Sequence, residues 1–276
     1  MMDKGTLYIV STPIGNLSDI TFRAVEVLKN ADAIAAEDTR HTLKLLNSLG
    51  IKNRLISFHE YSDPKKAQYL IDMLIEGKSL ALVTDAGTPL ISDPGSPLIS
   101  LAYENEVQVT AVPGACAAVT ALTLSGMSCE RFVFEGFIPR DSSRKQVLER
   151  VKNYDCTCVL YESPHQLLKT LFELYEYCGD RNIAICKELT KMHENVERLS
   201  LKEAVQKYSE LQIKGEYVLV LEGAVKEETK ITDEDITAAL QKCIESGETK
   251  KSAVKTVSQM MDVPKNRVYQ LMLNMD

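Results

Sequence analysis

Short apolar runs alternate with amphipathic stretches along most of this chain, and that alternation predicts strands and helices in turn. In the first half the runs lie at residues 7–10, 33–36, 80–83 and 107–112, with a weaker one at 54–59. Each of these runs is long enough only for a buried strand. Apolar residues recur at helical spacing between the runs, as Phe22, Val25 and Leu28 do. We therefore expect a parallel sheet covered by helices.

The second half repeats this alternation. Its apolar runs lie at residues 132–137, 156–161, 183–186 and 217–221. They predict a second α/β unit, with a boundary between Gly126 and Arg131. We place the first α/β domain at 1–128 and the second at 129–224.

After Gly223 the composition changes to a charged linker at 226–230, followed by helical patterns. Three short helices are expected near 233–244, 250–260 and 264–273, in an order that resembles a helix-turn-helix. These residues form a predicted helical domain, 225–276. The basic residues of its last two helices are Lys250, Lys251, Lys255, Lys265 and Arg267. They predict either a face that contacts nucleic-acid phosphates or an ordinary solvated face.

The segment from residue 80 to residue 97 is the one around which the chain is organised. It reads L-A-L-V-T-D-A-G-T-P-L-I-S-D-P-G-S-P, a buried strand followed by a rigid loop. Its glycines and prolines restrict the backbone, and Asp85 and Asp93 add hydrogen-bond acceptors. Ligands of open α/β sheets bind where such strands end. The alternative is an ordinary turn between a strand and a helix.

Two other strand ends carry similar turns. Pro13 and Gly15 follow the first run, in a loop that is neither a dinucleotide fingerprint nor a P-loop. Pro113 and Gly114 follow the fifth run and lead into small residues, which permit close approach of a flat ligand or tight helix–sheet packing. The ends of parallel strands share one sheet edge, so we expect these turns and Asp85 to form one ligand site.

A fourth strand end places two acids, a hydroxyl and a cation together, in the string Glu37-Asp38-Thr39-Arg40. Asp38 or Thr39 could cap the following helix, and acids favour a helix N-terminus. The other interpretation is a polar wall of an active site. The sequence leaves both open.

Composition narrows the class of protein. The chain has 276 residues, 45% of them hydrophobic, and a net charge of −7, so it is not a bulk nucleic-acid binder. Its seven cysteines show no zinc-site spacing, which predicts free thiols and no metal. We find neither a signal peptide nor a membrane-length apolar stretch, and we expect a cytoplasmic protein that does not enter a membrane.

Six strings in order resemble the tetrapyrrole methylase superfamily, and more closely its ribosomal small-subunit RNA methyltransferase I family. They are S-T-P-I-G-N-L at 11–17, E-D-T-R at 37–40, D-A-G-T-P-L-I-S-D-P-G at 85–95, V-P-G-A at 112–115, E-S-P-H at 162–165 and K-E-L-T-K at 187–191. The resemblance implies two α/β domains with the cofactor, S-adenosyl-L-methionine, in the cleft between them. Thr12-Pro13-Ile14-Gly15-Asn16, Thr88 and Glu162 differ from the tetrapyrrole-modifying members and match the RNA-modifying branch.

The resemblance also implies an activity and a site. That branch transfers a methyl group to the ribose 2′-hydroxyl of a cytidine in the decoding region of 16S rRNA. The implied partners are the small ribosomal subunit and a second copy of the chain. The implied cofactor-binding residues are Pro13, Gly15, Asp85, Ala86, Gly87, Ile91, Cys116, Ala117, Tyr161, Glu162 and Leu189.

The ribose hydroxyl is a weak acid, so a base should assist its attack on the methyl group. We expect Asp38 or Glu37 as that base, with Arg40 or Lys187 steering phosphate or ribose. Two alternatives stay open. They are a methylase of corrin-type small molecules with the same cofactor, and a non-catalytic RNA-binding relative.

Overall fold

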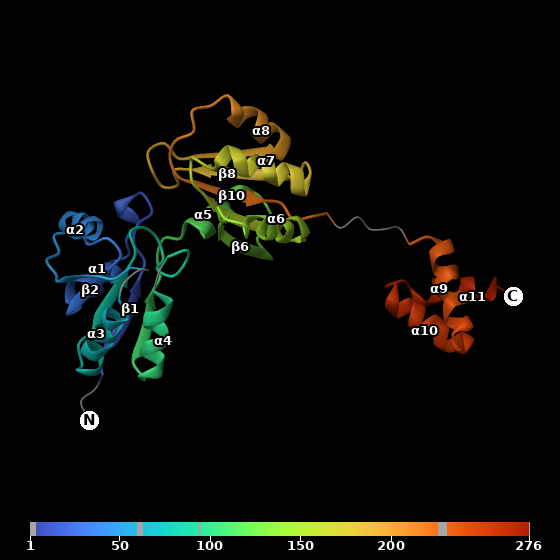
Figure 1. The fold of residues 1–276 in the computed structure, drawn as a ribbon, viewed down its shortest axis with the longest axis horizontal. Coiled ribbons are helices and arrows are strands. Elements are labelled where there is room, and N and C mark those ends of the chain that lie inside the picture. Colours follow the sequence, from blue (N-terminus) through green and yellow to red (C-terminus); the bar gives the residue numbers. More distant parts are fainter. Residues whose placement is uncertain (1–3, 60–62, 94, 226–230, 276) are drawn as a thin grey trace. The chain divides into compact units, whose positions relative to one another are not determined.

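The computed structural model describes residues 4–59, 63–93, 95–225 and 231–275. Contacts between residues divide the chain into two units, Met1–Ala224 and Val225–Asp276 (Figure 1). The linker expected at 226–230 lies outside the described residues.

The first sheet has five parallel strands in the order β3-β2-β4-β1-β5. They are β1 (Thr6–Val10), β2 (Ala33–Ala36), β3 (Leu55–Ser57), β4 (Leu80–Val83) and β5 (Gln108–Val112). Every residue of β2 and β4 is buried, as expected for a parallel sheet covered on both faces. Because β1 lies between β4 and β5, the loops that follow these three strands meet at one sheet edge.

Helices cover both faces of this sheet. They are α1 (Phe22–Asn30), α2 (Thr39–Ser48), α3 (Pro64–Ile75) and α4 (Ser96–Glu104), and a short 3-10 helix, η1 (Leu17–Asp19), precedes α1. Leu28 of α1 and Leu46 of α2 pack in one core cluster. Leu70 of α3 and Leu98 of α4 pack in another. The parallel α/β fold expected for the first half is confirmed.

The second sheet is mixed, with the order β6-β7-β10-β8-β9. Its strands are β6 (Phe132–Phe137), β7 (Thr157–Glu162), β8 (Asn182–Lys187), β9 (Asn195–Ser200) and β10 (Tyr217–Leu221). β6 and β7 pair in parallel, whereas the pairs β7–β10, β10–β8 and β8–β9 are antiparallel. The pattern of apolar runs does not reveal β9, because this edge strand carries polar residues such as Glu197 and Arg198.

Four helices pack against the second sheet. They are α5 (Ala117–Ser125), α6 (Arg144–Asn153), α7 (Leu167–Cys178) and α8 (Leu201–Ser209). α5 directly follows the last strand of the first sheet, yet its Ala121 and Leu122 pack against Val159 and Val220 of the second. The chain therefore crosses from one sheet to the other at the N-terminus of α5.

The second unit consists of α9 (Asp233–Glu245), α10 (Lys250–Met260) and α11 (Lys265–Leu273). Ile236, Leu240, Val257 and Val268 are buried between these helices. In the described part of the chain, no helix combines the length and apolar character needed to cross a bilayer.

Candidate active site

Three loops at the carboxyl edge of the first sheet are joined by hydrogen bonds. The Thr12 N–H donates to the Gly87 carbonyl at 2.8 Å, and the Gly87 N–H donates back to Thr12 at 3.1 Å. The Thr88 hydroxyl lies 3.0 Å from the Ser11 hydroxyl and donates to the Ala115 carbonyl at 3.0 Å. The turns that follow β1, β4 and β5 thus form one connected surface.

A cavity of about 340 Å³ lies between this surface and the second sheet. Its walls come from the loops after β1 and β4, the start of α5, the ends of β6, β7 and β8, and the start of β10. Eight of the residues predicted to bind the cofactor line it: Ala86, Gly87, Ile91, Cys116, Ala117, Tyr161, Glu162 and Leu189.

The other three predicted cofactor residues lie beside this cavity. Pro13 and Asp85 line a smaller hollow of about 170 Å³ together with His41 and Lys44. Gly15 faces the loop after β8. A larger hollow, of about 710 Å³, lies where β7 and β8 begin and contains none of the predicted residues. The strand-end cavity is therefore the candidate active site.

Gly15 lets the two α/β halves approach closely. A Cβ at this position would lie 2.8 Å from the Thr190 hydroxyl oxygen and 2.9 Å from the Leu189 carbonyl oxygen. The neighbouring Asn16 N–H donates to the Thr190 hydroxyl at 3.1 Å. A side chain at Gly15 would push Leu189, a residue of the cavity wall, away from the first sheet.

We expect Gly15→Ala to weaken cofactor binding about tenfold, since overpacking of this kind costs about 1–3 kcal/mol. Isothermal titration calorimetry with S-adenosylmethionine measures the change. The control is Gly50→Ala, whose methyl group meets no atom within 4 Å; its φ of 66° makes it a control for general destabilisation by backbone strain without overpacking. Unchanged affinity in Gly15→Ala would contradict the assigned close approach.

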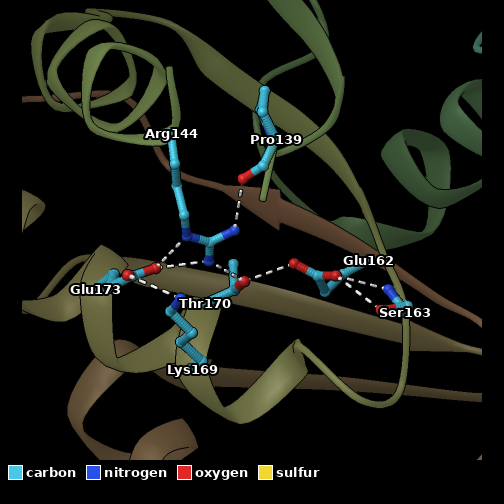
Figure 2. Close-up of polar contacts among 7 residues, drawn as sticks. All are labelled: Pro139, Arg144, Glu162, Ser163, Lys169, Thr170 and Glu173. Atoms are coloured by element: carbon cyan, nitrogen blue, oxygen red, sulfur yellow. Dashed lines mark hydrogen bonds and ion pairs between the residues drawn. The ribbon is translucent and has the colours of Figure 1, made fainter. Parts of the chain in front are cut away.

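Glu162, at the end of β7, is held by a buried polar network (Figure 2). One carboxylate oxygen accepts from the Ser163 N–H at 2.7 Å and the other from the Thr170 hydroxyl at 2.5 Å. The Thr170 oxygen accepts from Arg144 at 2.8 Å, and Arg144 pairs with Glu173. Residues of α6 and α7 thus set the orientation of a carboxylate in the cavity wall.

The two candidate bases that follow β2, Asp38 and Glu37, have different hydrogen-bond partners. Asp38 is the N-cap of α2, accepting from the Arg40 N–H at 2.8 Å, so the capping interpretation is confirmed for it. Its carboxylate also pairs with the Arg40 guanidinium at 2.7 Å, and these bonds hold the pKa of Asp38 well below its ordinary value. Glu37 instead accepts from the Thr84 hydroxyl at 2.9 Å.

Lys187 lies on the second sheet, at the end of β8. Its ammonium nitrogen is 5.9 Å from the centroid of the Tyr217 ring, which lines the cavity. Among the described residues, neither Lys187 nor Arg40, Asp38 or Glu37 lines the cavity itself. Asp93, which the sequence indicates only as a hydrogen-bond acceptor in the loop, does line it.

Comparisons with known proteins agree with this architecture. The family model for tetrapyrrole (corrin/porphyrin) methylases matches residues 6–205. A cobalt precorrin-4 methyltransferase superposes with a TM-score of 0.59 at 18% identity, over 79% of this chain and 94% of that one. A diphthine synthase gives a TM-score of 0.62 at 16% identity, over 79% and 90%. The fold is that of a tetrapyrrole methylase.

Curated relatives narrow the class further. A protein of Halalkalibacterium halodurans named ribosomal RNA small subunit methyltransferase I is 46% identical, over 98% of this chain and 95% of its own. Proteins of the same name from Bacillus subtilis and Synechocystis are 43% and 41% identical, each over at least 94% of both chains. This chain belongs to the ribosomal RNA small subunit methyltransferase I family, as its motifs indicated.

Proposed function

We propose that this protein methylates the ribose 2′-hydroxyl of a cytidine in the decoding region of 16S rRNA, with S-adenosylmethionine as the methyl donor. The observation that carries the proposal is the match to relatives of that family over nearly the whole chain, tail included. The name of those relatives supports rRNA as the substrate. The cytidine, its ribose oxygen and the decoding region come from the family resemblance.

The cavity fits the proposed cofactor in size and in chemistry. Its volume of about 340 Å³ falls in the range of small-molecule sites. Ile14, Leu189 and Val218 give it apolar walls, and Glu162 gives it an acceptor. Gly87 has a φ of 87°, so the backbone there takes a conformation that favours glycine and leaves room beside the cavity.

The eight predicted residues that line the cavity would hold the cofactor, with Pro13, Gly15 and Asp85 shaping its border. When bound, S-adenosylmethionine supplies a methyl group already activated on a sulfonium, so the chain mainly has to align the acceptor oxygen and exclude water. The apolar wall of the cavity would exclude water. Tyr161 fixes the start of α5 beside the cavity, because its hydroxyl accepts from the Ala118 N–H at 3.1 Å.

The helical unit is the proposed contact with RNA phosphates. Lys250, Lys251, Lys255 and Lys265 are exposed on α10 and α11. Arg267 is exposed as well, but it pairs with Asp233 at 2.7 Å and so also holds α11 to α9. A ribosomal partner implies a cytoplasmic protein, and the superfamily implies a homodimer. Light scattering at micromolar concentration tests the dimer, against which a monomeric mass would count.

The experiment that tests the function is methyl transfer from labelled S-adenosylmethionine to small ribosomal subunits lacking this modification, with free 16S rRNA alongside. We expect label on the ribose of one cytidine, located by nuclease digestion and mass spectrometry. If the protein binds the cofactor but labels neither RNA, the result would favour a small molecule as the methyl acceptor. No cofactor binding at all would favour a non-catalytic relative.

A further inference from the structure

The loop between β4 and α4 holds its backbone in an unfavourable conformation beside the cavity. Leu90 has a φ of 77° and Ser92 a φ of 64°, although neither is a glycine. A Cβ on Gly136 of β6 would lie 2.9 Å from the Ser92 hydroxyl oxygen, so the loop sits tightly against the second sheet. Such strain persists where surrounding structure enforces it, and it is concentrated at functional sites. Asp93, which follows Ser92 in this loop, lies in the cavity wall.

Asp93 lies in a negatively charged environment. It is half-buried. The carboxylates of Glu37 and Asp85, which follow β2 and β4, repel the negative charge of its ionised form. Thr84 offers a single hydroxyl proton, which it donates to Glu37 at 2.9 Å and which Asp93 also competes to accept. Burial above all, together with these two carboxylates, raises the pKa of Asp93 to about 6. Tyr161 faces it from β7, and Glu162, Glu216 and Cys116 line the same cavity.

Asp38 presents the opposite arrangement. Its carboxylate is occupied by the Arg40 guanidinium and the start of α2, which stabilise its charged form. A carboxylate held in this way has little tendency to accept a proton. An effective general base lies in reach of the reacting atoms and has a pKa near the working pH. Asp93 meets both requirements better than Asp38.

We propose that Asp93 is the general base of the methyl transfer, an inference that rests on the proposed function. The ribose oxygen forms a bond to the methyl carbon while sulfur keeps the electron pair of the broken carbon–sulfur bond. The hydroxyl proton passes to a carboxylate oxygen of Asp93, which later releases it to water. Charges and atoms balance without a further reactant. Glu37 and Asp85 act as positioning residues, because their charges keep Asp93 ready to accept the proton.

The kinetic test compares Asp93→Asn with the wild type in single-turnover methylation of small subunits. We expect the rate to fall at least about 100-fold, while the affinity for S-adenosylmethionine changes little. The wild-type rate should fall below about pH 6, where Asp93 becomes protonated, and the variant should lack this dependence. The control is Asp72→Asn, an exposed carboxylate on α3 that accepts from Gln68.

A second readout does not depend on activity. Carbon-13 NMR of protein labelled at its aspartates follows the titration of Asp93. The signal of Asp93 is identified as the one that is missing from the spectrum of Asp93→Asn. We expect a pKa near 6 that falls in Glu37→Gln, because that change removes one neighbouring negative charge. An ordinary pKa, or full activity of Asp93→Asn on subunits that the wild type labels, would overturn this base alone. Absence of label with the wild type would overturn the proposed function itself.

Discussion

Replacement of Arg144 by methionine is expected to lower the free energy of unfolding by about 3 kcal/mol. Only 5% of Arg144 is exposed, and its guanidinium donates to Glu173 at 2.7 Å, to Thr170 at 2.8 Å and to the Pro139 carbonyl at 3.2 Å. Methionine preserves much of the volume but leaves the Glu173 carboxylate without its main partner. The loss of one member of a buried pair is costly because the other remains desolvated.

Thermal unfolding measures this loss, as a decrease in Tm of about 6–12 °C for a unit of this size. The cofactor affinity should fall as well, since Arg144 no longer donates to the Thr170 hydroxyl, which orients Glu162 at the cavity wall (Figure 2). Lys169→Met is the matched control. Lys169 is 4.0 Å from Glu173 and more than half exposed, so its loss should cost under about 0.5 kcal/mol. Equal Tm values for the two variants would contradict the assigned role of Arg144.

Truncation of the chain after Ala224 should leave cofactor binding intact and reduce methylation of small subunits at least about 100-fold, because lysine–phosphate contacts supply much of the affinity for nucleic acid. The contacts that hold the two sheets and their cavity all lie within Met1–Ala224. Calorimetry and single-turnover methylation separate the two effects. Undiminished methylation by the shortened chain would refute the role of the helical unit in RNA binding.

Reversing the charge of lysines in the helical unit tests the same role in RNA binding while the unit stays in place. The triple change of Lys250, Lys251 and Lys255 to glutamate should weaken subunit binding and lessen its salt dependence, because fewer counterions are released. Lys242→Glu, on α9 and outside the predicted set, is the control. A salt dependence equal to that of the wild type would show that α10 contacts no phosphate.

The sequence by itself determined the elements that depend on local pattern. A fully buried parallel strand needs an unbroken apolar run, so β2 and β4 could be predicted within their observed bounds. Rigid turns after Val10, Val83 and Val112 predicted that their loops meet, because parallel strands end at a common edge. The strings at 11–17 and 85–95 identified the family, since so many restrictive residues in order seldom recur by chance.

The tertiary structure alone decided which neighbour each polar group meets. β9 was missed because an edge strand keeps one side in water and needs no apolar run. Nothing local shows that Arg144 reaches Thr170 or that Glu37 lies near Asp93, since these partners lie far apart in the chain. Hydrophobic periodicity records which face of an element is buried. The charge state and the pKa of a side chain depend on its distances to groups in other helices, strands and loops, and only the packed fold sets those distances.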